Sequence, residues 1–140
     1  MSLKHEFLVQ DSDVKDFITK EQLEKTEVDD YIILYINDSL KWVQTYWNKN
    51  ESEKSGLNYY GLTIIKGNSI KHLREIIIGW TNMFSEAPEE FLLTGSYILN
   101  DNQYERRKFR KKDVLFQLEK MVDICNQSID QGKPLLHKGI

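Results

Sequence analysis

Histidine and cysteine, the side chains most often used as metal ligands, general bases or nucleophiles, are few in this sequence. The histidines His5, His72 and His137 stand far apart, and none has the HxH or HxxxH spacing that brings two imidazoles to one metal. No serine lies in a G-x-S-x-G turn, and the sequence has no glycine-rich phosphate loop. The lone cysteine, Cys125, lies on the apolar side of an expected helix and is interpreted as a small core residue. We therefore expect no catalytic residue, no metal and no cofactor, and a protein that is not an enzyme.

A basic run is the sharpest charge feature of the chain. Residues 104–112, YERRKFRKK, place six cations around Phe109. One interpretation is a nucleic-acid contact, in which the cations bind phosphates and an aromatic ring stacks on a base. The other is a solvated edge strand whose positive charges discourage edge-to-edge aggregation. The candidate nucleic-acid residues are Arg106, Arg107, Lys108 and Arg110.

The charge distribution is asymmetric. Residues 1–60 carry seven Lys/Arg against twelve Asp/Glu, whereas residues 104–140 carry nine against five. Because the whole chain has a formal charge of −3, nucleic acid is the less expected partner. The acidic residues are either a solvated helix face or a docking surface that steers a basic protein partner. The candidate docking residues are Asp16, Glu24, Glu27, Asp29, Asp30, Glu86, Glu89 and Glu90.

Helices that would position these residues are indicated by apolar periodicity. An unbroken stripe from Ile70 to Phe84 predicts a long helix, which Pro88 prevents from continuing. A second stripe predicts a helix over residues 113–131, ended at Gly132 by a left-handed cap. Shorter helices are predicted over residues 11–27 and, with a strand as the alternative, over residues 40–49.

Strands are indicated by short apolar, β-branched and aromatic runs between turn signals. The predicted strands are residues 5–10, 31–36, 58–66, 91–99 and, as the hairpin partner of the last, 104–112. A loop is predicted over residues 48–57, and the apolar C-terminal residues are expected to be held in a sheet. The expected core residues are Ile32, Leu34, Ile64, Leu73, Ile77, Trp80, Phe84, Leu92, Tyr97, Leu118, Val122 and Cys125.

Length and composition bound the architecture. A chain of 140 residues with 40% hydrophobic and 29% charged residues is typical of one globular domain. The elements predict a single α+β domain over residues 1–140, with a largely antiparallel sheet of three to five strands and three or four helices packed against it. There is no signal-peptide pattern and no apolar run long enough to cross a membrane, so we expect a cytoplasmic protein.

The second half of the chain, residues 58–140, carries a recognisable combination of features. A tryptophan near a helix end (Trp80) is followed by an Ala87-Pro88 turn, a strand with an internal glycine, a last helix, and an ending of the type LH-x-GI. This combination resembles small bacterial immunity proteins of polymorphic-toxin and contact-dependent inhibition systems. The resemblance implies a non-enzymatic protein that binds one cognate toxin domain and blocks it.

No contact residue can be carried over from that family by motif, since its toxin-contacting surfaces vary. The acidic residues named above are expected as contacts for a separate reason. Many such toxins are nucleases, and a nuclease has a basic substrate cleft that acidic side chains complement. Two function classes are therefore favoured: a toxin inhibitor that acts by stoichiometric binding, and a nucleic-acid-binding module that uses residues 104–112. An enzyme of unknown type is the third alternative, which a pocket lined by His72 or His137 together with carboxylates would indicate.

Overall fold

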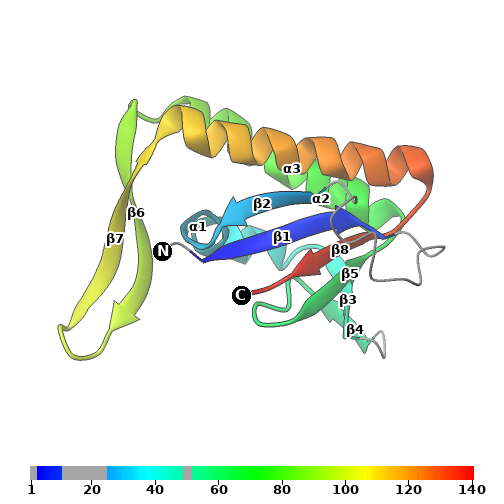
Figure 1. Cartoon of the computed structure of the whole chain (residues 1–140), viewed down its shortest axis with the longest axis horizontal. Coiled ribbons are helices and arrows are strands. Elements are labelled where there is room, and N and C mark those ends of the chain that lie inside the picture. Colours follow the sequence, from blue (N-terminus) through cyan, green and yellow to red (C-terminus); the bar gives the residue numbers. More distant parts are fainter. Residues whose placement is uncertain (1–2, 11–24, 49–51) are drawn as a thin grey trace.

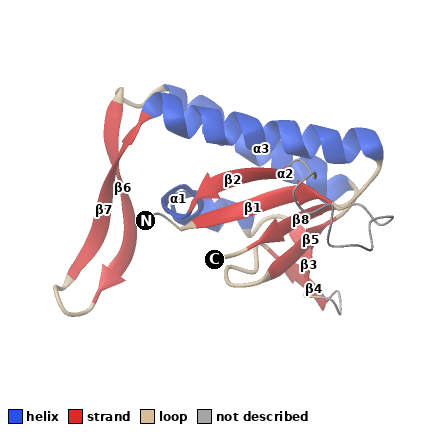
Figure 2. Ribbon diagram, viewed as in Figure 1, coloured by secondary structure: helices blue, strands red, loops and turns tan. Residues whose placement is uncertain are grey.

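The computed structural model describes residues 3–10, 25–48 and 52–140, which form three helices and eight strands. The α+β class predicted from the sequence is confirmed (Figure 2). In chain order the elements are β1 (Lys4–Val9), β2 (Lys25–Asp29), α1 (Asp30–Leu40), β3 (Gln44–Trp47), β4 (Ser52–Ser55), β5 (Leu62–Ile65), α2 (Asn68–Ser85), β6 (Glu90–Ile98), β7 (Gln103–Arg110), α3 (Lys111–Gln131) and β8 (Leu135–Lys138).

Six strands form one antiparallel sheet in the order β2-β1-β8-β5-β3-β4, which exceeds the predicted three to five by one strand. The C-terminal strand β8 lies between β1 and β5, so the chain end is held in the sheet as predicted. Helix α3 packs against α2 and against β2, β1 and β8 (Figure 1). Helix α3 thus covers the half of the sheet that contains its β2 edge, and α2 packs against α3.

Strands β6 and β7 pair only with each other and form a long hairpin that projects beside the six-stranded sheet (Figure 1). Strand β6 packs against α1, and β7 continues directly into α3. The predicted pairing of residues 91–99 with residues 104–112 is confirmed. Its consequence is that a two-stranded arm stands outside the main sheet.

One hydrophobic cluster joins the sheet, the three helices and the base of the hairpin. The predicted core residues Leu73 and Ile77 of α2, and Leu118 and Cys125 of α3, are buried in it. Leu92 and Tyr97 were expected there too, but they are 60% and 45% exposed. The reason is topological, because the part of the hairpin that carries them has no layer packed against one of its faces. The remaining members of the predicted core are buried (Ile32, Ile64, Phe84) or half-buried (Leu34, Trp80, Val122).

The two long helices follow the predicted pattern. Helix α2 spans Asn68–Ser85, and Pro88 follows it after a short turn. Helix α3 begins at Lys111, two residues before the predicted start, and Gly132 ends it with a left-handed backbone (φ 64°) as predicted. Glycine is suited to this position because it carries no Cβ to clash.

The predicted central strand at residues 31–36 is wrong, because these residues form helix α1. Asp29 caps that helix: its side chain accepts a hydrogen bond from the Tyr31 backbone N–H at 2.9 Å. A six-residue apolar run has no periodicity that separates a buried strand from a buried helix, and the cap decides between them here. The strand in this part of the chain is β2, which directly precedes α1 and contains residues 25–27, the last three of the helix predicted over 11–27. The rest of that predicted helix lies outside the described residues.

Three further predictions are corrected in the next segment. Residues 40–49 hold strand β3 rather than a helix, since Tyr46 and Trp47 pair with both β4 and β5. The predicted loop at 48–57 contains the exposed edge strand β4. The strand predicted over 58–66 is shorter, because Gly61 lies in a turn closed by its N–H to the Asn58 carbonyl at 3.1 Å.

Candidate functional site

Hairpin β6–β7 presents two different faces. Directly opposed residues of an antiparallel pair lie on the same face, so the register separates them. The inner face, toward α1 and β2, contains the pairs Phe91–Phe109 and Leu93–Arg107. The outer face, toward solvent, contains the pairs Glu90–Arg110, Leu92–Lys108, Thr94–Arg106 and Tyr97–Tyr104.

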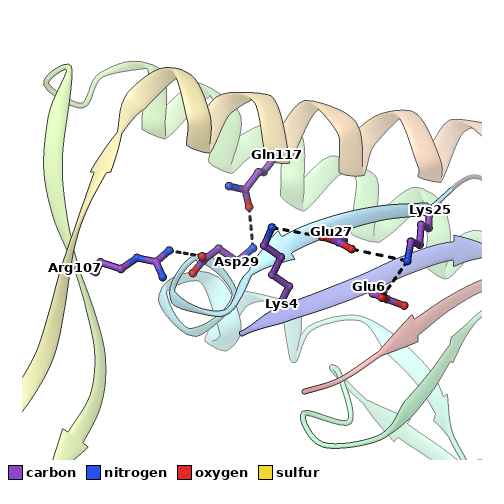
Figure 3. Close-up of polar contacts among 7 residues, drawn as sticks. All are labelled: Lys4, Glu6, Lys25, Glu27, Asp29, Arg107 and Gln117. Carbon is purple, nitrogen blue, oxygen red and sulfur yellow. Dashed lines mark hydrogen bonds and ion pairs between the residues drawn. The ribbon is translucent and has the colours of Figure 1, made fainter. Parts of the chain in front are cut away.

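The inner face is fastened to the rest of the protein by Arg107. Its guanidinium forms an ion pair with Asp29 (Figure 3). The same group lies 4.4 Å from the centre of the Phe109 ring and 4.8 Å from that of Tyr31. The Tyr31 hydroxyl in turn donates to Glu105 Oε2 at 2.9 Å. A cation between two aromatic faces and a carboxylate holds the arm in one position.

Asp29 is the residue at which four elements meet. Besides its ion pair to β7 and its cap on α1, its backbone N–H donates to Gln117 Oε1 of α3 at 2.8 Å (Figure 3). The residue is only 4% exposed. Asp29 is therefore a structural junction between β2, α1, α3 and the hairpin, through its carboxylate and its backbone N–H.

Gly95 allows this junction to close. A Cβ at Gly95 would lie 2.8 Å from the Tyr31 ring, which is closer than real Cβ contacts. The missing side chain lets the ring of Tyr31 lie against the hairpin backbone. The internal glycine of this strand thus has a packing role.

The outer face combines large apolar side chains with cations. Leu92 and Tyr104 are 60% and 57% exposed, and the Tyr97 and Tyr104 rings meet edge to face with centroids 5.0 Å apart. Lys108 bonds Glu90 at 2.7 Å, and this contact holds the pKa of the Glu90 carboxyl below its ordinary value. The outer face therefore offers an amphipathic surface on a projecting arm.

A groove of about 820 Å³ lies between β2, β7 and α3. Six cations and three carboxylates line it, a balance of +3 in a chain whose formal charge is −3. The cations are Lys4, Lys25, Arg107, Lys108, Arg110 and Lys120, and the carboxylates are Glu27, Asp29 and Asp113. Concentrating positive charge in one hollow of an acidic protein favours an anionic ligand.

A second polar cluster is buried where the two ends of the chain meet. His137 Nδ1 lies 3.0 Å from Thr63 Oγ1, His137 Nε2 lies 2.8 Å from His5 Nδ1, and His5 Nε2 lies 2.9 Å from Asp30 Oδ1. The Tyr59 hydroxyl donates to the same oxygen of Asp30. The chain of hydrogen bonds joins β5, β8, β1 and α1.

The carboxylate of Asp30 determines which atom is the donor in each hydrogen bond of this series. An ionised carboxylate only accepts, so His5 Nε2 carries hydrogen and His5 Nδ1 accepts from His137 Nε2. His137 Nδ1 then accepts from the Thr63 hydroxyl. Both imidazoles are neutral and 0% exposed, so neither can touch a substrate.

Burial explains why the two rings stay neutral. It lowers the pKa of His137 to about 3, and the neighbouring His5 adds to this effect. Burial also lowers the pKa of His5, against the opposing influence of Asp30. Sequence spacing could not have indicated this pair, because the two histidines are 132 residues apart.

The acidic residues predicted as a docking surface are dispersed. Asp16 and Glu24 lie outside the described residues. The carboxylates of Asp29 and Asp30 bond within the protein, Asp29 to Arg107 and Asp30 to His5 and Tyr59. Glu27 is exposed and forms ion pairs with Lys4 at 3.5 Å and Lys25 at 3.9 Å (Figure 3).

The remaining predicted acidic residues lie at the corner between α2 and β6. Glu86 and Glu89 are exposed there, and Glu90 pairs with Lys108. Cations of β7 and α3 share the corner, since Glu89, Glu90, Arg110, Lys111 and Lys112 line one hollow. Among the described residues the acidic candidates therefore form no continuous acidic surface.

The basic run divides between the two hairpin faces. Arg106, Lys108 and Arg110 lie on the outer face, while Arg107 is turned inward to Asp29. Alternation along a strand requires this division once residues 103–110 are extended. The lysines that complete the groove, Lys4, Lys25 and Lys120, come from other elements and were not identified from the sequence.

Other candidate chemistry has a structural explanation. Cys125 is fully buried, and burial raises the pKa of its thiol to about 12. In the described ranges, no group of three or more His, Cys, Asp or Glu side chains is placed to hold a metal ion. None of the described helices combines the length and apolar character needed to cross a membrane.

Comparison of the chain with family models, curated proteins and solved structures finds no match.

Proposed function

We propose that the protein is an immunity-type inhibitor, which neutralises one toxin domain by binding it stoichiometrically, and that hairpin β6–β7 is the main contact element. The observation that carries the proposal is the outer face of the hairpin. It exposes Leu92, Tyr97 and Tyr104 together on an arm that projects from the fold. Grouped exposed apolar side chains with a polar surround are typical of protein-binding surfaces.

The composition of the outer face supports a protein partner. Tyrosine and arginine are enriched among the residues that contribute most to binding energy, and Tyr97, Tyr104 and Arg106 are neighbours here. The Arg107–Asp29 junction holds the arm before it meets a partner. Preorganisation reduces the entropy lost on association. The exposed Glu86 and Glu89 at the base of the arm would extend the contact toward a basic cleft of the toxin. We expect this binding to take place in the cytoplasm.

The first test is protection of cells that express the toxin encoded beside this protein. The parent chain is expected to protect, and the triple variant Leu92→Ser, Tyr97→Ala, Tyr104→Ala is expected to lose protection. Removal of interface aromatics costs about 2 kcal/mol or more each at central positions, which weakens binding by a factor of about 30 or more. Toxin binding by calorimetry measures the loss directly.

Trp42→Ala is the matched control, because Trp42 is an aromatic residue that is 69% exposed and lies between α1 and β3, outside the hairpin strands. It is expected to leave protection intact. Both variants are checked by urea denaturation so that loss of fold is separated from loss of contact. Full protection by the triple variant would remove the hairpin from the proposal, and failure of the parent chain to protect would remove the inhibitor function.

A second function, nucleic-acid binding, is supported by the shape of the same arm. A two-stranded β-ribbon fits the major groove of duplex DNA, and the outer face carries Arg106, Lys108 and Arg110. Binding of this kind weakens steeply with salt, because phosphate contacts release counterions. Arg106→Ala with Arg110→Ala is expected to reduce both the affinity for a duplex and its salt dependence. Absence of binding to duplex DNA at low salt would exclude this function.

A further inference from the structure

The groove between β2, β7 and α3 borders the β2 edge of the six-stranded sheet, to which the described residues add no further strand. Strand β2 is terminal in the sheet, with β1 as its one described neighbour. The Asp30 N–H donates inward to the Leu3 carbonyl at 2.9 Å, whereas the Asp29 N–H points outward to Gln117. Because backbone groups alternate in direction along a strand, those of Glu27 and Lys25 also point outward. Residues whose backbone faces away from β1 therefore line the groove.

The other walls of the groove carry side chains suited to an extended acidic chain. Phe116, Gln117 and Lys120 extend along one flank of α3, and Phe116 is 59% exposed with the Lys120 ammonium 5.4 Å from its ring centre. Arg110 stands at the β7 end. Neither Arg110 nor Lys120 forms an ion pair with a described carboxylate, in contrast to Lys4, Lys25, Arg107 and Lys108.

We propose that this groove binds an extended acidic segment of a partner protein, which adds as a strand to the edge of β2 that faces away from β1. The backbone of Glu27 would supply the ladder hydrogen bonds, and Arg110 and Lys120 would bind carboxylates of the segment. Main-chain bonding of this type supplies affinity, and the flanking side chains supply specificity. The inference goes beyond the proposed function, because it requires only a partner with such a segment and uses the β2 edge and α3, sharing only Lys108 and Arg110 with the outer face of the hairpin.

A peptide suits this groove better than a nucleic acid does. Glu27, Asp29 and Asp113 lie among the cations and repel a phosphate backbone, which carries a charge at every nucleotide, whereas a peptide can place uncharged residues opposite these carboxylates. A free strand edge presents donors and acceptors in alternation, which a peptide backbone matches and a row of phosphates does not. The net charge of the groove then selects an acidic peptide from among extended chains.

The test uses a fluorescein-labelled octapeptide of alternating valine and glutamate, titrated against the full chain by fluorescence anisotropy. The same peptide with every backbone amide methylated keeps the charge and removes the N–H donors. We expect binding of the first peptide and at least a tenfold weaker affinity for the second. Equal affinity for the two would show attraction by charge alone, and no binding at millimolar concentration would exclude the site; either result overturns the proposal.

Two pairs of variants locate the contact. Glu27→Pro removes an outward N–H without disturbing the β1 pairing, whereas Glu27→Ala removes only the side chain. We expect Glu27→Ala to bind the acidic peptide more tightly than the parent chain, and Glu27→Pro to bind at least tenfold more weakly than Glu27→Ala. Lys120→Glu is expected to weaken binding about tenfold, whereas Lys71→Glu on the exposed side of α2, the charge-matched control, leaves it unchanged.

An eight-residue oligothymidine tests the competing ligand class. Tighter binding of the oligonucleotide than of the peptide, weakened by the same Lys120→Glu change, would assign the groove to nucleic acid and overturn the proposal. Equal peptide affinities of the Glu27→Pro and Glu27→Ala variants would exclude strand addition. None of these measurements involves a toxin, so failure of the groove proposal and failure of the inhibitor function are distinguishable.

Discussion

Lowering the pH from 7 to 5 is expected to reduce the free energy of unfolding by about 2–4 kcal/mol through His5 and His137. Both imidazoles are buried and neutral in the folded protein, and burial lowers their pKa values. In the unfolded chain each has a pKa of about 6.5. Since the free energy of unfolding of a small domain is about 5–15 kcal/mol, a loss of this size makes the fold marginal in mild acid.

The sign follows from which state binds protons. As the pH falls below about 6.5, the unfolded chain takes up a proton at each histidine and the folded chain does not. Each histidine then removes up to about 1.4 kcal/mol of stability per pH unit. For His137 the loss continues until the pH approaches its folded value of about 3. For His5 it ends sooner, because the Asp30 carboxylate favours the protonated form.

Urea denaturation at several pH values between 7 and 5 measures the effect. His137→Gln is the informative variant, since an amide can accept from Thr63 and donate to His5 without titrating. It is expected to be less stable at pH 7 but to lose stability with falling pH at about half the parent rate. His72→Gln, on the exposed side of α2, controls for removal of a histidine elsewhere. A parent chain whose stability is constant over this range would contradict the proton assignment.

The buried histidines also show where sequence reasoning ends. Apolar periodicity identified α2 and α3 because each has a long, one-sided stripe, and turn signals identified the hairpin because its strands are adjacent in the chain. His5 and His137 meet only because β8 inserts between β1 and β5. A contact between the two chain ends has no local spacing from which to predict it. Such contacts depend on strand order, which periodicity does not encode.

The candidate contact surface could not be predicted from the sequence for the same reason. Asp29 is one of several acidic residues in the sequence, and its burial depends on Arg107, 78 residues later in the chain. The basic run was visible, but its division between two hairpin faces required the register. Leu92 and Tyr97 were expected in the core because the sequence of β6 is apolar. The sequence does not show that one face of this strand is uncovered. Two of the residues proposed for partner binding, Leu92 and Tyr97, are therefore those for which the core prediction was wrong.

The Asp29 junction connects stability to the proposed contacts. Arg107 fastens the arm from the inner face, directly behind the outer-face residues proposed to meet a partner. The same junction forms one end of the groove beside β2. Loss of Arg107 is thus expected to affect both surfaces because it changes the position of the hairpin, and not because Arg107 itself contacts a partner.

Replacing Arg107 with methionine is expected to cost about 2–4 kcal/mol of stability. Methionine retains much of the apolar contact with Tyr31 and Phe109, so the loss comes mainly from the Asp29 carboxylate, whose side chain is 6% exposed. Removing one partner of a buried ion pair leaves the other charge desolvated and unpaired. The loss is below that of a fully buried pair, because the Arg107 side chain is 37% exposed.

A double-mutant cycle with Asp29→Asn isolates this effect. Asparagine still caps α1, since it accepts from the Tyr31 N–H as well as aspartate does, but it carries no charge. In the Asp29→Asn background, Arg107→Met no longer leaves an unpaired buried carboxylate. The double variant is therefore expected to be about 1–3 kcal/mol more stable than the sum of the single changes implies. Urea denaturation of the four proteins gives the coupling. Additive losses would mean that the ion pair does not fasten the hairpin, and the preorganisation argued for the binding arm would then have to come from the apolar contacts of its inner face alone.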